Sequence, residues 1–171
     1  VLFIHDAGAC ADETIAPLAQ GIGAVIWTSE EEQNKHKCFV LAPCYPTVCA
    51  NDEFEVTPEA GYTVDLVKEM AKKYSIDENR IYGTGQSMGC MMLCEINIRY
   101  PELFGGCLLV AGQWNPKTMG VCKDKNFWII VSQGDQKAFP IMGACMESVE
   151  KAGGKVTRGA FNAKTSDEAL R

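Results

Sequence analysis

The sequence predicts an α/β fold built on a mostly parallel sheet with helices on both faces. Short apolar runs typical of buried strands alternate along the chain with longer segments of helical period. Such alternation favours a parallel sheet. One predicted strand runs into Gly85-Gln86-Ser87-Met88-Gly89, and an apolar helix follows directly. A Gly-x-Ser-x-Gly turn between a strand and a helix is the layout of a nucleophile elbow, which belongs to this fold class.

The first half of the chain is predicted to contribute two buried strands and a helix. Val1–His5 is a short apolar run that ends in the polar turn Asp6-Ala7-Gly8-Ala9. A helix is expected over about Glu13–Ala24, and a second buried strand over Cys38–Ala42. The segment Tyr45–Pro58 is rich in proline, asparagine and aspartate and is expected to be a loop. Loops of this kind beside a strand end often line a site.

The second half continues the alternation. Thr57-Pro58-Glu59 opens a helix that keeps its apolar period to Tyr74, and proline in the first turn suits a helix start. The remaining elements are a strand over Arg80–Gly85, a helix from Ser87 to about Tyr100, buried strands over Cys107–Ala111 and Phe127–Val131, a helix over Ala138–Ala152 and a strand over Lys155–Phe161. Ser166-Asp167-Glu168 is expected to cap a last helix.

Composition limits the function classes. A chain of 171 residues, of which 47% are hydrophobic, suits one domain with a sizeable core. The net charge of −6, with acidic and basic residues interspersed, argues against a nucleic-acid surface, which would be basic. No apolar run is long enough to cross a bilayer. We therefore expect neither nucleic acid nor membrane as a partner, and the sequence leaves the oligomeric state open.

The nine cysteines are odd in number, scattered and mostly set in apolar runs. Buried free thiols in a reducing compartment explain this usage most simply, which favours the cytoplasm, although the chain opens on a strand at Val1 and no secretion signal can be read there. Cys38, Cys44 and Cys49 form no Cys-x-x-Cys pair, which argues against a zinc site. No metal or cofactor is implied.

Ser87 is the candidate nucleophile. Gly85 and Gly89 lack a Cβ atom, so neighbouring backbone can approach the tight turn without a clash. The Ser87 hydroxyl would stand at the carboxyl edge of the sheet, beside the positive N-terminal end of the next helix, which suits a developing oxyanion. Out of context the pattern often marks an ordinary glycine-rich turn. The strand before it and the helix after it favour catalysis.

Two further strand ends carry residues suited to the same chemistry. After the first strand, His5-Asp6-Ala7-Gly8 offers backbone N–H groups beside the nucleophile. Ala7 is the expected oxyanion donor there, together with the N–H of Met88. Asp135 follows the strand Phe127–Val131 and comes after Ser87 in the chain order, nucleophile then acid, of this fold. A plain turn aspartate is the alternative reading of Asp135.

These segments resemble the α/β-hydrolase superfamily, and within it esterases similar to polyhydroxybutyrate depolymerases and feruloyl esterases. The resemblance runs through Leu2–Gly8, Phe39–Pro43, Ile76–Gly89 and Trp128–Pro140, which together span nearly the whole chain. It implies a catalytic triad with Ser87 and Asp135, and it gives His5 a structural place in the oxyanion loop. Glycine usually follows this histidine in the family, whereas Asp6 follows it here.

The catalytic histidine of the family lies beyond the aspartate, and no histidine follows Asp135 in this chain. The sequence contains only His5 and His36, and His36 reads as a solvated surface residue within Asn34-Lys35-His36-Lys37. We therefore expect residues 1–171 to form a single, partial domain of a longer polypeptide. The missing parts would be the first strands of the sheet and a C-terminal segment that carries the histidine.

The resulting prediction is a serine hydrolase that cleaves a small-molecule or polymeric carboxylic ester through an acyl-enzyme on Ser87. His5, Gln86 and Trp114 are candidate pocket residues, and a core position is the equally open reading for Trp114. Two other functions stay open. A peptidase of the same fold, similar to prolyl oligopeptidases, would use the same residues on an amide. An inactive hydrolase-like binding module would explain the missing histidine.

Overall fold

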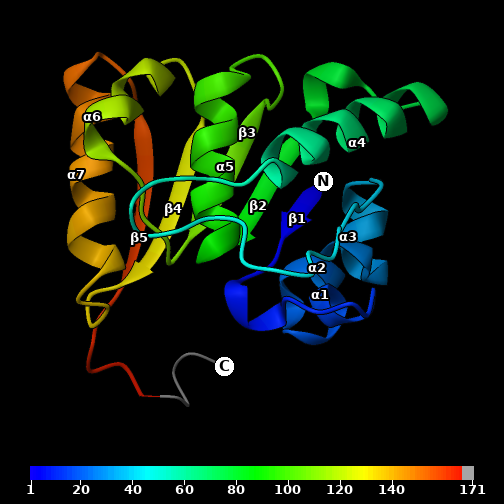
Figure 1. Ribbon diagram of the computed structural model, residues 1–171, viewed down its shortest axis with the longest axis horizontal. Helices are drawn as coiled ribbons and strands as arrows, with labels where there is room; N and C mark the ends of the chain where they lie inside the picture. Colours follow the sequence, from blue (N-terminus) through cyan, green and yellow to red (C-terminus); the bar gives the residue numbers. More distant parts are fainter. Residues whose placement is uncertain (167–171) are drawn as a thin grey trace.

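The computed structural model describes residues 1–166, and within them five parallel strands form one sheet in the order β1-β2-β3-β4-β5 (Figure 1). The strands are β1 (Leu2–Ile4), β2 (Tyr82–Gln86), β3 (Gly106–Val110), β4 (Phe127–Ser132) and β5 (Val156–Phe161). In register, Gln86 pairs with Val110, and Val110 pairs with Ile130. The carboxyl ends of β2, β3 and β4 therefore lie side by side. This arrangement confirms the predicted α/β fold with a parallel sheet.

Four helices pack on one face of this sheet (Figure 1). They are α4 (Glu59–Lys73), α5 (Met88–Arg99), α6 (Pro116–Met119) and α7 (Ala138–Lys151). Their apolar side chains share a core with strand residues such as Ile4, Leu109 and Ile129. Helix α5 lies in the middle of this layer, which explains why it is buried nearly all round.

The opposite face is covered at its β1 end. The connection after β1 contains α1 (Ala16–Ala19), α2 (Ile22–Val25) and α3 (Glu30–Lys35). A Cβ atom at Gly23 would lie 2.5 Å from Cε2 of Phe3, so α2 packs directly on that side chain. Phe3 points away from Ile4 because successive strand residues face opposite sides. Helices thus lie on both faces of the sheet, as predicted.

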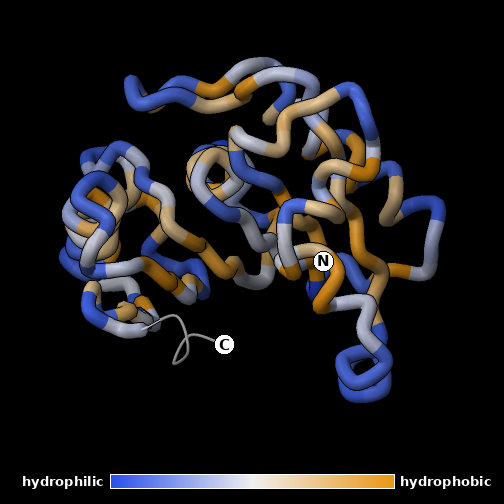
Figure 2. The backbone as a smooth tube through the Cα atoms, turned by 90° about the horizontal axis from the view of Figure 1, so that it is seen from below, coloured by the Kyte–Doolittle hydropathy of each residue, from blue (hydrophilic) through white to orange (hydrophobic). Residues whose placement is uncertain are grey.

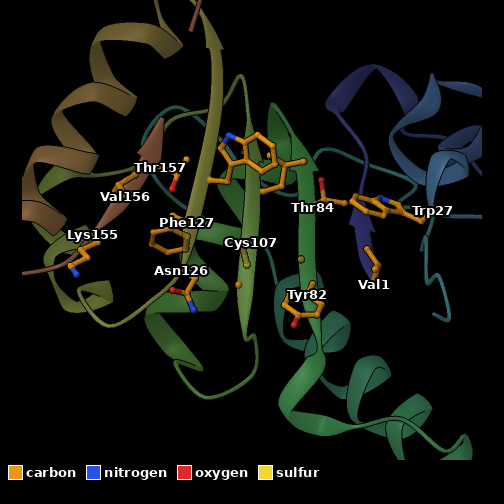
Figure 3. A pocket seen from close by; sticks show the side chains of 14 residues that line it. Val1, Trp27, Tyr82, Thr84, Cys107, Asn126, Phe127, Lys155, Val156 and Thr157 are labelled. Carbon is orange, nitrogen blue, oxygen red and sulfur yellow. The ribbon is translucent and has the colours of Figure 1, made fainter. Parts of the chain in front are cut away.

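Beyond α2, this second face is open to solvent among the described residues. Trp128 is 53% exposed and Tyr82 is 44% exposed. A hollow of about 420 Å³ lies on the face, and Figure 3 shows Tyr82, Thr84 and Trp27 beside it. Strands β3 and β4 alternate between buried and accessible residues. The prediction that both strands are buried holds for alternate residues only. At these strands the described helices cover one face of the sheet, the face of α4 to α7.

Two of the expected elements in the first half differ from the structure. The helix expected over Glu13–Ala24 is split into α1 and α2, because Gly21 has φ 157° and ψ −162°, a non-helical conformation that residues with a side chain rarely adopt. The strand expected over Cys38–Ala42 is reduced to an isolated parallel bridge between Leu41 and Leu2. β1 is only three residues long and offers little backbone to pair with. The backbone N–H of Phe3 still donates to the carbonyl of Leu41 at 2.8 Å.

The later elements agree with their predicted bounds to within two residues, and α6 was not predicted. Short 3₁₀ turns complete the described elements: η1 (Ala7–Ala9), η2 (Ile26–Thr28), η3 (Glu78–Arg80) and η4 (Gly120–Cys122). The cap expected at residues 166–168 extends outside the described residues. Seen from below, apolar segments run mainly through the middle of the molecule and hydrophilic turns lie toward its outside (Figure 2). No helix within residues 1–166 combines the length and apolarity needed to cross a membrane.

Candidate active site

Ser87 forms the sharp turn between β2 and α5 that the motif predicts. Its backbone has φ 52° and ψ −113°, a strained conformation for a residue with a side chain. The turn is held from both sides: the Ser87 N–H donates to the carbonyl of Val110 at 2.9 Å, and the Met91 N–H donates to the carbonyl of Ser87 at 3.0 Å. The surrounding hydrogen bonds therefore fix the strained residue at the carboxyl edge of the sheet.

The glycines of the turn are required by close backbone contacts. A Cβ atom at Gly89 would lie 2.0 Å from the carbonyl oxygen of Ile4, and one at Gly85 would lie 2.6 Å from the carbonyl carbon of Gly89. At the end of the neighbouring strand, a Cβ atom at Gly112 would lie 2.8 Å from the carbonyl oxygen of Ser87. Each distance is shorter than a side-chain carbon tolerates. The pattern around Ser87 is therefore a packed elbow and not an ordinary glycine-rich turn.

His5 is a buried anchor for the loop that follows β1. Its side chain is 0% exposed. Nε2 accepts a hydrogen bond from the backbone N–H of Tyr45 at 3.0 Å, and Nδ1 lies 2.7 Å from the carbonyl oxygen of Asp6. Because Nε2 is an acceptor, this network assigns the proton to Nδ1, which donates to Asp6. Both ring nitrogens are occupied, so His5 has no free nitrogen with which to act as a base or line a pocket.

Asp6, the residue that departs from the family pattern, joins the oxyanion loop to the elbow. Its Oδ1 accepts from the Gly8 N–H at 2.6 Å and so caps η1. Its Oδ2 accepts from Nε2 of Gln86, the residue before Ser87, at 3.4 Å. Gln86 is exposed beside the site. The carboxylate thus links, through side-chain contacts, the loop after β1 to the last residue of β2.

The two predicted oxyanion donors follow neighbouring strands. Ala7 is exposed after β1, and within residues 1–166 its N–H has no hydrogen-bond acceptor. Met88 is the first residue of α5, and the N–H groups of the first helical turn have no acceptor within the helix. Both groups are therefore available to an anion at this edge of the sheet, and the N-terminus of α5 adds partial positive charge.

Asp135 follows β4 and caps the start of α7. Its Oδ1 accepts from the backbone N–H of Lys137 at 3.0 Å and from that of Ala138 at 2.7 Å. No described residue donates to Oδ2, which leaves that oxygen available to orient an imidazole. β2 and β4 are separated by β3, so their ends are about 10 Å apart at ordinary strand spacing. Ser87 and Asp135 lie on the same edge of the sheet, as predicted.

The structure supports the core reading of Trp114. The side chain is 1% exposed and its Nε1 donates to Oε2 of Glu95 at 3.1 Å. The ring also meets Phe54 edge-on, with 5.8 Å between ring centroids. Trp114 therefore packs under the loop that carries Phe54, and its buried ring does not present a surface to a ligand.

His36 lies far from the elbow. It is exposed at the C-terminal end of α3 and lines a groove of about 1120 Å³ that also contains Arg80 and Tyr82. Tyr82 begins β2, whereas Ser87 follows its last residue. The length of this strand corresponds to roughly 16 Å. The predicted surface role of His36 agrees with this position at the amino edge.

The structure also shows where the cysteines lie. All nine thiols are free, and Cys49, Cys90, Cys94, Cys107, Cys122 and Cys145 are buried. Burial raises the pKa of the thiols of Cys107, Cys122 and Cys145 to about 12, which keeps them protonated and unreactive. Within residues 1–166, no group of three or more histidine, cysteine or acidic side chains is arranged to hold a metal ion.

Sequence reasoning missed one polar cluster at the carboxyl edge. Asp52, from the loop Tyr45–Pro58, accepts a hydrogen bond from Nε2 of Gln113 at 3.0 Å and pairs with Nζ of Lys137 at 2.6 Å. The available signals were the position of Gln113 shortly after a strand and that of Lys137 two residues after Asp135. Neither signal indicates a partner in a loop that is distant in the sequence.

Comparisons with known proteins agree with this geometry. No protein-family profile matches the chain. The structure of a thermostable esterase is 26% identical, with a TM-score of 0.91 and coverage of 98% of this chain and 47% of that chain. A ferulic acid esterase shares the fold at 10% identity, with a TM-score of 0.69 and coverage of 99% and 78%. The chain thus spans about half the length of the thermostable esterase.

A curated relative extends the likeness to sequence. Poly(3-hydroxyalkanoate) depolymerase C of Paucimonas lemoignei is 30% identical over an alignment of 89 residues, which covers 46% of this chain and 22% of that protein. The parallel sheet, the turn at Ser87 and these likenesses define an α/β-hydrolase fold of the type found in esterases. The expected resemblance to esterases and to a depolymerase is confirmed by the thermostable esterase and by the curated relative, and the ferulic acid esterase shares the fold.

Proposed function

We propose that this protein is a serine hydrolase that cleaves carboxylic esters. The observation that carries the proposal is the elbow at Ser87, whose strained backbone is held by hydrogen bonds to Val110 and Met91 and lies among the close backbone contacts of Gly85, Gly89 and Gly112. Strain of this kind persists only where surrounding structure imposes it, and it concentrates at functional sites. Esterase neighbours that share the fold add independent support.

In the proposed reaction the Ser87 hydroxyl attacks the ester carbonyl. The N–H groups of Met88 and Ala7 stabilise the oxyanion of the tetrahedral intermediate, which collapses with release of the alcohol and leaves an acyl group on Ser87. Water then attacks the acyl-enzyme, and the carboxylic acid leaves. Asp135 orients the imidazole that moves the proton in both steps. We assign that imidazole to a histidine outside residues 1–171, because His5 is fully engaged and His36 lies at the other edge.

The missing base also keeps the binding-module function as a second candidate, and turnover separates the two. The polypeptide as it occurs should hydrolyse p-nitrophenyl butyrate, and Ser87→Ala should lower turnover by about 10⁶, as removal of a triad nucleophile does. A fluorophosphonate probe should label Ser87 and no residue in the variant. Labelling without ester turnover, but with cleavage of a peptide p-nitroanilide, would indicate a peptidase. If the protein shows no labelling and no turnover, the result favours the binding module.

A further inference from the structure

The loop Tyr45–Pro58 crosses in front of the N-terminal part of α5 before it returns to α4 (Figure 1). Its tip is a turn that is held by side-chain hydrogen bonds. Oδ1 of Asn51 accepts from the N–H groups of Glu53 at 3.1 Å and Glu55 at 3.0 Å. Phe54 adopts a positive φ of 64°, and its ring packs on the buried Trp114. The turn therefore presents the side chain of Asp52 in a defined direction.

The partners of Asp52 form a receptor for a carboxylate. Nε2 of Gln113 donates to Oδ1 at 3.0 Å, and the Lys137 ammonium lies 2.6 Å from the carboxylate. Gln113 is only 4% exposed, so the protein holds its amide in place. The side chains of Asp52 and Lys137 are 58% and 56% exposed. An exposed ion pair contributes little to stability, so another carboxylate from solution can replace Asp52 at small cost.

This cluster lies beside the proposed catalytic residues. Gln113 directly follows Gly112, whose Cβ position is 2.8 Å from the carbonyl oxygen of Ser87. The backbone N–H of Lys137 donates to Oδ1 of Asp135 at 3.0 Å. The two donors thus come from the ends of β3 and β4, next to the segments that carry the nucleophile and the acid. A short substrate bound at Ser87 can reach them, since the ends of β2 and β4 are about 10 Å apart.

We propose that Lys137 and Gln113 form a binding subsite for the free carboxylate of an ester substrate, and that Asp52 occupies this subsite in the free protein. The inference rests on the proposed ester hydrolysis and names its substrate class: esters that carry a terminal acid group, such as short hydroxyacid oligomers. Lys137 supplies the charge, and the buried amide of Gln113 supplies the direction. Asp52 acts as an internal competitor that neutral esters do not need to displace.

Binding can be measured without turnover by calorimetry on the full chain carrying Ser87→Ala. The probes are the 3-hydroxybutyrate dimer as its free acid and the same dimer as its methyl ester. Asp52→Ala should strengthen binding of the acid by about tenfold, and Lys137→Gln should weaken it by about tenfold, which corresponds to one charge-assisted hydrogen bond. The methyl ester should bind equally to all these proteins.

Matched controls remove a like charge elsewhere. Glu53→Ala deletes the neighbouring acid of the same turn, and Lys117→Gln deletes an exposed cation of α6; neither should alter the preference for the acid over its ester. Circular dichroism should show each variant folded. The proposal is overturned if Asp52→Ala and Lys137→Gln leave the preference unchanged, or if the acid does not bind to Asp52→Ala. Turnover of p-nitrophenyl butyrate by the chain with Ser87 intact tests the hydrolase function separately.

Discussion

Gly89 and Ile4 lie in contact across 85 positions of sequence, so close that a Cβ atom on Gly89 would be 2.0 Å from the carbonyl oxygen of Ile4. The contact presses the first turn of α5 against the end of β1. It therefore holds the start of the helix that carries Met88 beside the end of the strand that leads into Ala7.

Replacement of Gly89 with alanine should disrupt this contact. Because the neighbouring atom is backbone, the strand or the helix must shift, and we expect the free energy of unfolding to fall by about 3 kcal/mol or more. Gly143→Ala is a matched control: Gly143 is helical in α7, and apart from its chain neighbours and the nearby backbone of its own helix no described atom lies within 4 Å of the position that its added methyl group would take. It should gain roughly 0.5–1 kcal/mol. Urea denaturation of both variants measures the difference, and equal stabilities would contradict the close contact.

Ser87→Gly should separate stability from activity. Glycine accepts a positive φ without strain, so relief of the strain at φ 52° should outweigh the added freedom of the unfolded chain and stabilise the protein by about 1 kcal/mol. Ester hydrolysis should be lost in the same variant. Ala111→Gly, at φ 47° after β3, should gain similar stability and keep the hydroxyl of Ser87. Thermal unfolding and p-nitrophenyl ester assays would show this, and a destabilised Ser87→Gly would argue against a strained elbow.

Asp135 should have two roles that different substitutions divide. Asp135→Asn retains an oxygen to cap α7 through the N–H groups of Lys137 and Ala138, but it removes the charge that orients the imidazole. We expect turnover to fall by about 10⁴ with the stability changed by less than about 1 kcal/mol. Asp135→Ala should lose about 1 kcal/mol of stability as well. Full activity in Asp135→Asn would remove Asp135 from the proposed triad.

The buried thiols should make stability depend on pH in the alkaline range. Burial raises the pKa of the Cys107, Cys122 and Cys145 thiols to about 12, whereas an unfolded thiol titrates near 9. Between these values the unfolded state binds fewer protons than the folded state, so the free energy of unfolding should fall as pH rises from about 9 toward 12. Urea titrations at pH 8, 9 and 10 measure the slope. A rising stability would contradict the burial of these thiols.

The same burial predicts slow alkylation. In the folded protein at pH 8, iodoacetamide should reach the three half-buried thiols of Cys10, Cys38 and Cys44 well before the buried ones. In denaturant without reductant, most of the nine cysteines should react, as reduced thiols do. Mass spectrometry counts the adducts in both cases. Four disulfides in the denatured sample would show that the cysteine pattern had been misinterpreted.

The sequence predicted the elements around the elbow well because their signals are local. The strand, the Gly-x-Ser-x-Gly turn and the apolar helix α5 are adjacent in the chain, and β4 and α7 have clear apolar periods. The buried strand expected at Cys38–Ala42 was less predictable, because a strand also needs a partner, and β1 offers only three residues. Likewise, Gly21 and Gly23 indicated a weak end for the helix expected over Glu13–Ala24, but no periodicity indicated that Gly21 would divide it into two helices.

By itself, the sequence determined the fold class, the candidate residues that follow each strand and the position of Ser87 on its turn, since each depends on residues that are neighbours in the chain. Only the tertiary structure decided that both ring nitrogens of His5 form hydrogen bonds, with Asp6 and Tyr45, and that Asp52 pairs with a lysine 85 positions away. The physical reason is that loop closure and side-chain direction create these contacts. Neither leaves a repeating pattern along the sequence, so a polar residue in a loop shows its partner only when the chain is folded.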